Sequence, residues 1–192
     1  MIKKWINGCY LNKKEIIHLR HQFIHNKPFP HLELKDFFIP EKIIKMLKAI
    51  SKEKLYEKES DLFKFMQTSD LSKTNNGVLR EFYRFLSGPD FITYLRWVTS
   101  LKLSYDKSVD FFGSAYQDTD YLLCHDDLLD KRKIAFNIYL SSFNKRDGGG
   151  LNLLNSKDLK PVKIEKKIIP MFNTFVVFEV SKNSFHEVEE VL

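Results

Sequence analysis

A histidine and two carboxylates follow directly on the short apolar run Tyr121–Cys124 in the second half of the chain. Side chains alternate faces along an extended chain, so His125 and Asp127 are expected to project to one side and Asp126 to the other. One imidazole nitrogen and one carboxylate oxygen are two of the three ligands of the 2-His-1-carboxylate site, which binds iron(II) and leaves coordination positions open. A His-x-Asp triplet is common by chance, so the rest of the chain must decide whether this one binds metal.

A histidine near the end of the sequence is the candidate for the third ligand. His186 follows the apolar segment Phe175–Phe178 and a turn at Lys182-Asn183. A lone histidine in such a position is more often a structural residue than a ligand, so its position alone does not assign it to a metal. Across a β-core from His125 and Asp127, it completes a set of two histidines and one carboxylate.

Three further histidines lie along one side of a helix predicted between Lys13 and Asn26. Two of them, His21 and His25, have the spacing of a helical metal pair. No acidic or sulfur-bearing residue joins them at a fitting spacing. We therefore interpret His18, His21 and His25 as part of a solvated polar helix face.

The segment Lys133–Ser142 alternates in a way that gives a strand two different faces. The apolar face is expected to pack against the N-terminal helices, and the other face carries Asn137 and Tyr139. That second face either meets solvent or lines a polar cavity in which the Tyr139 hydroxyl holds a small anion, and the pattern alone leaves both open. The residues of the apolar face are Ile134, Phe136, Ile138 and Leu140.

Helical patterns dominate the first half of the chain and strand patterns the second. The Gly148-Gly149-Gly150 run predicts either a backbone that approaches another group closely or a plain hairpin turn. Short strands at this spacing favour a sandwich or barrel, so we predict one α+β domain. Predicted helices cover residues 13–26, 40–50 and 79–86, and a further one begins at Pro89; predicted strands cover 32–34, 62–66, 111–117, 121–124, 133–142, 151–155, 162–169, 174–180 and 184–191.

The composition is that of one folded domain with a substantial core. The 192 residues include 17 phenylalanines and only 7 glycines and 6 prolines, which argues against disorder. A formal charge of +6 and a pI near 9.1 permit a nucleic-acid partner. The lysines are scattered among acids, however, so direct binding of nucleic acid is not expected.

Cysteine usage and hydropathy bear on location. Cys9 and Cys124 are too few for a disulfide framework, which favours a reducing compartment. Residues Met1–Asn12 contain no continuous apolar stretch and are not a signal peptide. Nowhere do about 18 apolar residues run together, so no membrane span is expected. We therefore expect a protein of the cytoplasm, the nucleus or both.

Several of these segments, in this order, resemble the iron(II)/2-oxoglutarate oxygenases. They are the strand that ends in His125-Asp126-Asp127, the strand Ile134–Leu140, the Gly149-Gly150 pair and the block Phe178–Val188. The stretches Asp61–Leu71 and Leu122–Asp127 resemble, more narrowly, the prolyl hydroxylases that modify a small-subunit ribosomal protein. The similarity runs from about Phe29 to the last residue.

The resemblance implies a double-stranded β-helix (jelly-roll) core with N-terminal helices packed on one sheet. It implies a single oxygenase domain over residues 1–192, helix-rich to about residue 108 and β-helical from about residue 110. It implies His125, Asp127 and His186 as iron(II) ligands and Tyr139 as a contact to 2-oxoglutarate. The implied reaction hydroxylates a prolyl residue of the ribosomal protein with O2, turns 2-oxoglutarate into succinate and carbon dioxide, and uses ascorbate as an auxiliary reductant.

The clamp for the distal carboxylate of 2-oxoglutarate departs from the family pattern. The family has an arginine on the strand after the distal histidine, and no arginine follows His186; other oxygenases use a lysine after the glycines, and Leu151–Asn155 contains none. The β-helix is therefore expected to lack its final strand. We expect the 192-residue chain to hold metal but to bind 2-oxoglutarate about 30- to 1000-fold more weakly and to hydroxylate little. Asn152 and Leu154 also stand where the family tends to have a polar or acidic residue and an aromatic.

Three hypotheses of different classes follow. The first is an iron(II)- and 2-oxoglutarate-dependent prolyl hydroxylase, and the second is a catalytically inactive form of the same fold that binds a protein partner. The third is a basic β-domain that binds nucleic acid. Turnover of 2-oxoglutarate with iron separates the first from the others, and a strongly salt-dependent affinity for RNA favours the third.

Overall fold

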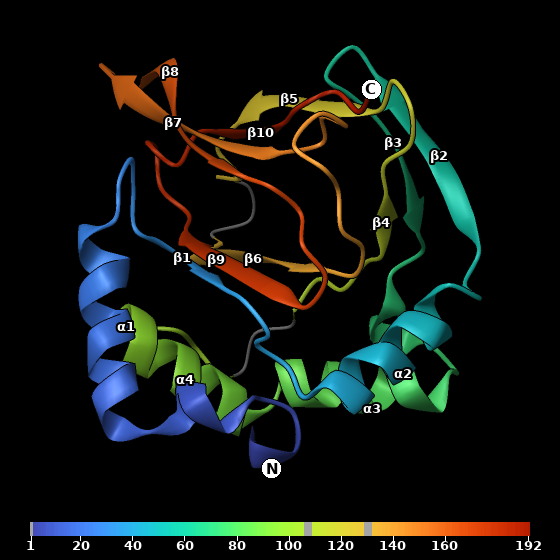
Figure 1. Ribbon diagram of the computed structural model, residues 1–192, viewed down its shortest axis with the longest axis vertical. Coiled ribbons are helices and arrows are strands. Elements are labelled where there is room, and N and C mark those ends of the chain that lie inside the picture. Colours follow the sequence, from blue (N-terminus) through green and yellow to red (C-terminus); the bar gives the residue numbers. More distant parts are fainter. Residues whose placement is uncertain (1, 106–108, 129–131) are drawn as a thin grey trace.

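Two antiparallel sheets face each other in the computed structural model, which describes residues 2–105, 109–128 and 132–192 (Figure 1). Within these ranges one sheet has three strands and the other seven. The smaller sheet has the order β1 (His31–Leu34), β9 (Thr174–Glu179), β6 (Ile134–Tyr139). The larger sheet has the order β2 (Leu55–Ser60), β3 (Phe63–Thr68), β5 (Tyr121–His125), β10 (His186–Val188), β7 (Leu151–Lys157), β8 (Lys160–Ile168), and β4 (Ser114–Ala115) pairs with β3.

Helices from the first half of the chain lie below the three-stranded sheet in Figure 1. Asparagine side chains cap α1 and α3, since Asn12 accepts from Glu15 N–H and Asn76 accepts from Val78 N–H. A proline starts each of the other two helices, where its missing N–H costs nothing. The helices are α1 (Lys13–His25), α2 (Pro40–Ile50), α3 (Gly77–Leu86) and α4 (Pro89–Thr99), with 3-10 turns at Ile2–Lys4, Gly8–Leu11 and Leu71–Lys73. No helix of the described ranges is long and apolar enough to cross a bilayer.

The larger apolar core lies between these helices and the three-stranded sheet. Phe175 of β9 is completely buried at its centre and stacks on Phe37 with 4.6 Å between ring centroids. Phe91 of α4 meets the same ring from the helical side at 6.0 Å. The strand predicted at residues 133–142 packs its apolar face into this core, as expected. The residues of that face are Ile134, Phe136, Ile138 and Leu140.

A smaller core fills the space between the two sheets. Val176 and Phe178 of β9 pack there against Leu151 and Leu153 of β7. Tyr139 packs against the same cluster, so it points to the interior between the sheets and not to solvent. Alternation along β6 therefore separates two faces as predicted: one packs on the helices, and on the other Tyr139 is half-buried between the sheets while Asn137 is exposed.

The strand boundaries show where periodicity alone was insufficient. Only Ser114–Ala115 of the predicted strand 111–117 is a strand, and only His186–Val188 of the predicted strand 184–191. The prediction missed β2 altogether. All six residues of β2 are exposed, because it is the edge strand of the large sheet, so its sequence Leu-Tyr-Glu-Lys-Glu-Ser carries no buried face to reveal it.

The glycine run allows a close approach between two backbones. Gly148 has φ +69°, and a Cβ atom there would lie 1.9 Å from the carbonyl oxygen of Glu190. The backbone N–H of Gly149 donates to the same carbonyl at 3.2 Å, and Gly148 forms a β-bridge with Val191. Of the two interpretations of this run, the structure favours close approach, and the partner is the segment after β10.

A pH-dependent contribution to stability arises from His31 in β1, which is buried and donates Nδ1–H to the carbonyl of Phe29 at 2.8 Å. Burial lowers the pKa of His31 from its ordinary value, and among its neighbours Lys166 lowers it further while Glu33 opposes this. The unfolded chain therefore binds a proton more readily, so this contribution is complete above about pH 6.5 and is lost as the pH falls below that value.

We expect His31→Phe to flatten the pH dependence of the free energy of unfolding between about pH 7.5 and about pH 5.5. Urea unfolding of the wild type and of His31→Phe across this pH range measures the two slopes. One proton can change the free energy of unfolding by at most about 1.4 kcal/mol per pH unit. His18→Phe, at an exposed position of α1, is the matched control for replacing a histidine by phenylalanine. Equal slopes in wild type and His31→Phe would contradict the assignment.

Candidate metal centre

Two histidines from strands far apart in sequence lie directly opposite each other in the large sheet. His186 on β10 pairs with His125 on β5, and cross-strand partners project from the same face of a sheet. Their ring centroids are 4.2 Å apart. The ring of Phe178, from the opposite sheet, lies 4.7 Å from the ring of His186 and forms the apolar floor of the site.

Backbone carbonyls fix the tautomer of both imidazoles. His125 Nδ1 lies 2.9 Å from the carbonyl oxygen of Leu123, and His186 Nδ1 lies 2.8 Å from that of Ser184. Since a carbonyl oxygen can only accept, each Nδ1 must carry a proton and donate it. Each Nε2 of the neutral ring is then left with a free lone pair, which is the form that a metal-binding histidine takes.

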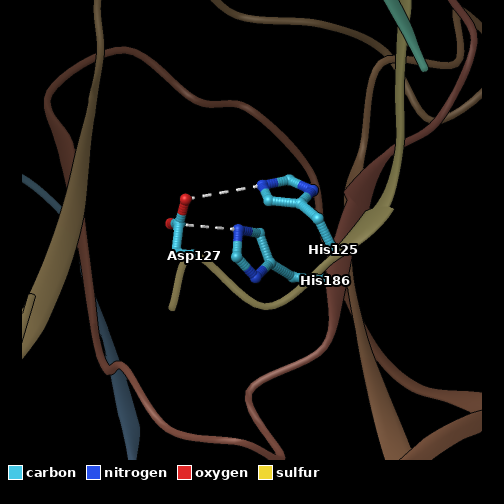
Figure 2. A group of neighbouring side chains, drawn as sticks. All are labelled: His125, Asp127 and His186. Atoms are coloured by element: carbon cyan, nitrogen blue, oxygen red, sulfur yellow. Dashed lines mark ion pairs between the residues drawn. The ribbon is translucent and has the colours of Figure 1, made fainter. Parts of the chain in front are cut away.

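Asp127 faces these two Nε2 atoms from the loop that follows β5 (Figure 2). One of its carboxylate oxygens is 3.4 Å from His186 Nε2, and the other is 3.7 Å from His125 Nε2. Asp127 lies on the side of the histidines, as expected, but strand alternation is not the cause, because β5 ends at His125. The carboxylate instead reaches the histidines through a left-handed backbone at Asp127, with φ +59°, a conformation that aspartate tolerates better than most residues.

The arrangement needs a cation between its members. The three ligand atoms all lie within 4.8 Å of one another, and no other group of three such residues in the described ranges is so close. Two imidazole lone pairs directed at a carboxylate repel it unless a proton or a metal ion lies between them. Two nitrogens and one carboxylate oxygen are the donor set that suits iron(II).

Electrostatics keep the ligands in their binding forms. Burial lowers the pKa of His125, and the neighbouring imidazole of His186 lowers it further, so the ring of His125 stays neutral. Burial alone would raise the pKa of Asp127. Interaction with His186 first, and with His125 and Arg132 after it, outweighs burial and holds the pKa of Asp127 below its usual value, so the carboxylate stays ionised.

Two residues that position the site were missed by sequence reasoning. Arg132 links Asp127 to Asp110, with nitrogen–oxygen distances of 3.5 Å and 3.0 Å. The completely buried Ser184 places its hydroxyl 3.1 Å from the carbonyl oxygen of Asp126 and so ties the turn before β10 to the loop after β5. Arg132 follows Asp127 by five positions, a spacing without periodic meaning, so no pattern in the sequence marks it.

Tyr139 lies in the interior between the sheets, but no hydrogen bond joins it to the three ligands. Burial raises the pKa of its phenol, and Tyr116 and Glu33 raise it further, so the hydroxyl stays protonated and can donate. Tyr116 is also protonated, because burial raises its pKa. Tyr116, a half-buried phenol that acts on the pKa of Tyr139, was not identified from the sequence. The role of Tyr139 as a contact to 2-oxoglutarate stays a prediction.

The histidines of α1 do not form part of this site. His21 and His25 stack on one another with 4.2 Å between ring centroids, and both are exposed. His25 Nδ1 lies 2.8 Å from the carbonyl oxygen of His21, within their own helix. This agrees with the interpretation of a solvated helix face.

A family model matches the part of the chain that holds the three ligands. Residues 111–192 match the 2OG-Fe(II) oxygenase superfamily, and this segment includes His125, Asp127 and His186. Outside the match lie α1 to α4, which cover the three-stranded sheet.

Curated relatives extend the similarity over most of the chain. "Prolyl 3-hydroxylase OGFOD1" of Xenopus laevis is 37% identical over 168 residues, which are 86% of this chain and 32% of the relative. "Prolyl 3-hydroxylase sudestada1" of Drosophila melanogaster is 38% identical over 152 residues, 74% of this chain and 27% of the relative. "Prolyl 3,4-dihydroxylase OGFOD1" of Ostreococcus tauri is 35% identical over 182 residues, which cover 85% of this chain and 35% of the relative. The chain therefore spans about a third of the length of these relatives.

Solved structures establish the fold. A prolyl-4-hydroxylase of Pseudomonas putida superposes with a TM-score of 0.68 at 14% identity, covering 92% of this chain and 91% of that one. A prolyl hydroxylase of Trichoplax adhaerens, solved with a peptide fragment of hypoxia inducible factor, gives a TM-score of 0.69 at 13% identity. This superposition covers 96% of this chain and 86% of that one. Together with the family match, these likenesses confirm the predicted double-stranded β-helix with helices on one sheet.

Proposed function

We propose that the 2OG-Fe(II) oxygenase domain at residues 111–192 makes this chain a prolyl hydroxylase whose iron(II) is held by His125, Asp127 and His186. One observation carries the proposal: two imidazole lone pairs and one carboxylate face a common position, on a chain that is 35–38% identical to proteins named as prolyl hydroxylases. Asp127 supplies the single negative charge of the ligand set. The remaining positive charge favours an anionic co-substrate such as 2-oxoglutarate.

The side chains around the ligands have distinct tasks in this reaction. Iron(II), when bound with 2-oxoglutarate and O2, supplies the oxidising power for hydroxylation of a C–H bond and releases succinate and carbon dioxide. Arg132 holds Asp127 toward the histidines. The carbonyls of Leu123 and Ser184 hold the two rings so that Nε2 faces the metal position. Tyr139, protonated and half-buried, is proposed to donate a hydrogen bond to a 2-oxoglutarate carboxylate.

A protein substrate fits the accessibility of the site. His186 is buried, whereas His125 and Asp127 are only half-buried, so the metal position can be reached from solvent on the side of the loop after β5. We propose a prolyl residue of a small-subunit ribosomal protein as the target. The support is the resemblance of Asp61–Leu71 and Leu122–Asp127 to the hydroxylases that act there.

Two further expectations belong to the same proposal. We propose ascorbate as auxiliary reductant and the cytoplasm, the nucleus or both as the location. The location is supported by two cysteines that are both free, Cys9 and Cys124.

Formation of succinate is the test of this function. The chain is incubated in air with iron(II), ascorbate and peptides that cover the prolines of small-subunit ribosomal proteins. The concentration of 2-oxoglutarate is raised to saturation, so that a weak affinity for the co-substrate does not hide turnover. We expect succinate to form only with a peptide that retains its proline, and we expect mass spectrometry to find that proline hydroxylated.

The controls separate the function from its alternative. A Pro→Ala peptide and the Asp127→Asn variant should give no succinate, while Asp126→Ala should keep it. If iron is bound but no peptide supports succinate at saturating 2-oxoglutarate, the proposal fails. The inactive protein-binding module then takes its place.

Tyr139→Phe should raise the concentration of 2-oxoglutarate needed for half-maximal turnover about 10- to 100-fold, because a hydrogen bond to a carboxylate contributes about 1.5–3 kcal/mol. Iron(II) affinity should not change, since Tyr139 makes no contact with the ligands. Tyr56→Phe, at an exposed position of β2, is the matched control. An unchanged 2-oxoglutarate requirement in Tyr139→Phe would remove this residue from the co-substrate site.

A further inference from the structure

An open pocket on the helical side of the molecule brings three cations and two aromatic rings together. It has a volume of about 470 Å³ and lies between α1 and the C-terminal end of α4. Its wall includes Arg20 of α1, Arg96 and Trp97 of α4, and Lys102 and Tyr105 of the segment that follows. Since α4 packs on the outer face of the three-stranded sheet, the pocket is separated from the metal centre by that sheet.

Within the part of the chain that the structure describes, the three cations of this pocket have no acidic partner. No described carboxylate lies within 4.0 Å of Arg20, Arg96 or Lys102. Few lysines and arginines of the described surface have such a partner, as Lys42 has in Glu81, so what distinguishes this pocket is that three of them gather around one depression. Three uncompensated positive charges around one depression attract an anion.

Hydrogen bonds and ring contacts hold two of these cations in place. Arg20 Nε–H donates to the carbonyl of Trp97 at 2.6 Å, which leaves both terminal amino groups of the guanidinium for a ligand. The Arg96 guanidinium lies 5.0 Å from the centroid of the Tyr105 ring, and the Tyr105 hydroxyl is 3.1 Å from the hydroxyl of Thr93. Groups that are already ordered lose less entropy when a ligand binds.

Helix capping explains only part of this arrangement. Cations near the C-terminal end of α4 interact favourably with its last carbonyls, which accounts for Arg20 and Arg96. It does not account for the aromatic residues. Trp97 is 52% exposed, more than any other aromatic residue described, and Tyr105 is 48% exposed. Large exposed rings beside unpaired cations are typical of surfaces on which bases stack.

We propose that this pocket binds single-stranded nucleic acid. Arg20 and Arg96 hold one phosphate through the forked geometry of guanidinium, Lys102 binds a neighbouring phosphate, and a base stacks on Trp97. An acidic peptide would use the cations but would leave the exposed indole without a function. The sequence led to the opposite expectation, because scattered basic residues give no sign that Arg20 and Arg96 meet in the fold.

Fluorescence anisotropy with a labelled oligouridylate of about ten nucleotides measures this binding directly. We expect Arg96→Gln/Lys102→Gln to weaken binding about 10-fold or more and Trp97→Ala to weaken it by a similar factor. The slope of log affinity against log salt should be about −1.4 for the two phosphates and should shrink in the double variant. The matched control is Lys160→Gln/Lys163→Gln on the exposed strand β8, which removes the same charge far from the pocket.

The outcomes separate this site from diffuse attraction by a basic protein. Binding that survives in the control but is lost in both pocket variants supports the site, with oligouridylate or oligothymidylate as probe. Equal weakening in the control and in the pocket double variant would overturn it, as would the absence of binding. Polyglutamate that competes as well as the oligonucleotide, with Trp97→Ala unchanged, would overturn it in favour of an acidic protein partner. Far-ultraviolet circular dichroism of each variant verifies that it is folded.

Discussion

Replacing Asp127 with alanine should weaken iron(II) binding about 100-fold or more, a larger effect than the 10- to 100-fold typical of residues that only support ligands. The carboxylate is the only anionic group among the three ligands. Without it, two neutral imidazoles remain to hold a divalent cation at a position open to water. Anaerobic titration with iron(II) against a chromophoric chelator measures the affinity.

The neighbouring carboxylate supplies the control for this prediction. Asp126 accepts the backbone N–H of Leu128 at 3.1 Å and does not take part in the group of three ligands, so Asp126→Ala should keep its iron. Because alanine at the left-handed position 127 is strained, Asp127→Asn is the second variant; it tolerates the backbone and removes only the charge. Iron affinity that is equal in Asp127→Asn and wild type would show that the carboxylate is not a ligand.

Phe175→Ala should lower the free energy of unfolding by about 3–5 kcal/mol. The side chain is completely buried where the helices meet the three-stranded sheet, and its ring contacts those of Phe37, Phe91 and Phe136. The large cavity left by alanine cannot close without moving both layers. Urea denaturation gives the value.

Phe112→Ala is the comparison for this substitution. Phe112 is 43% exposed, so its loss should change stability by less than about 1 kcal/mol. A change below about 1 kcal/mol in Phe175→Ala would mean that the helices do not depend on this sheet for their packing.

Much of this architecture could be predicted because buried faces leave periodic traces in the sequence. The two faces of β6 were separated correctly from alternation alone, since each meets a different apolar core. Helix α3 was recognised from Leu79, Phe82 and Leu86, all of which are buried. Where an element lacks a buried face, as in β2, the same method has nothing to detect.

The sequence predicted that His125, Asp127 and His186 lie together, but it did not predict the geometry that orients them. Pairing of His125 with His186 follows from the strand order, which the resemblance supplied and periodicity did not. The left-handed backbone conformation of Asp127 is a local feature that no hydrophobic pattern in the sequence predicts. Arg132 acts through a contact made only in the folded chain, as does Arg20 at the nucleic-acid pocket that we propose.

The most direct measurement of the proposed metal centre is anomalous X-ray scattering at the iron edge, from crystals grown and soaked with iron(II) without oxygen. We predict one anomalous peak at about 2.0–2.2 Å from His125 Nε2, His186 Nε2 and a carboxylate oxygen of Asp127. The peak should be absent from Asp127→Asn crystals treated in the same way. Iron bound at another position, such as beside His21 and His25, with no peak between the three residues, would contradict the account.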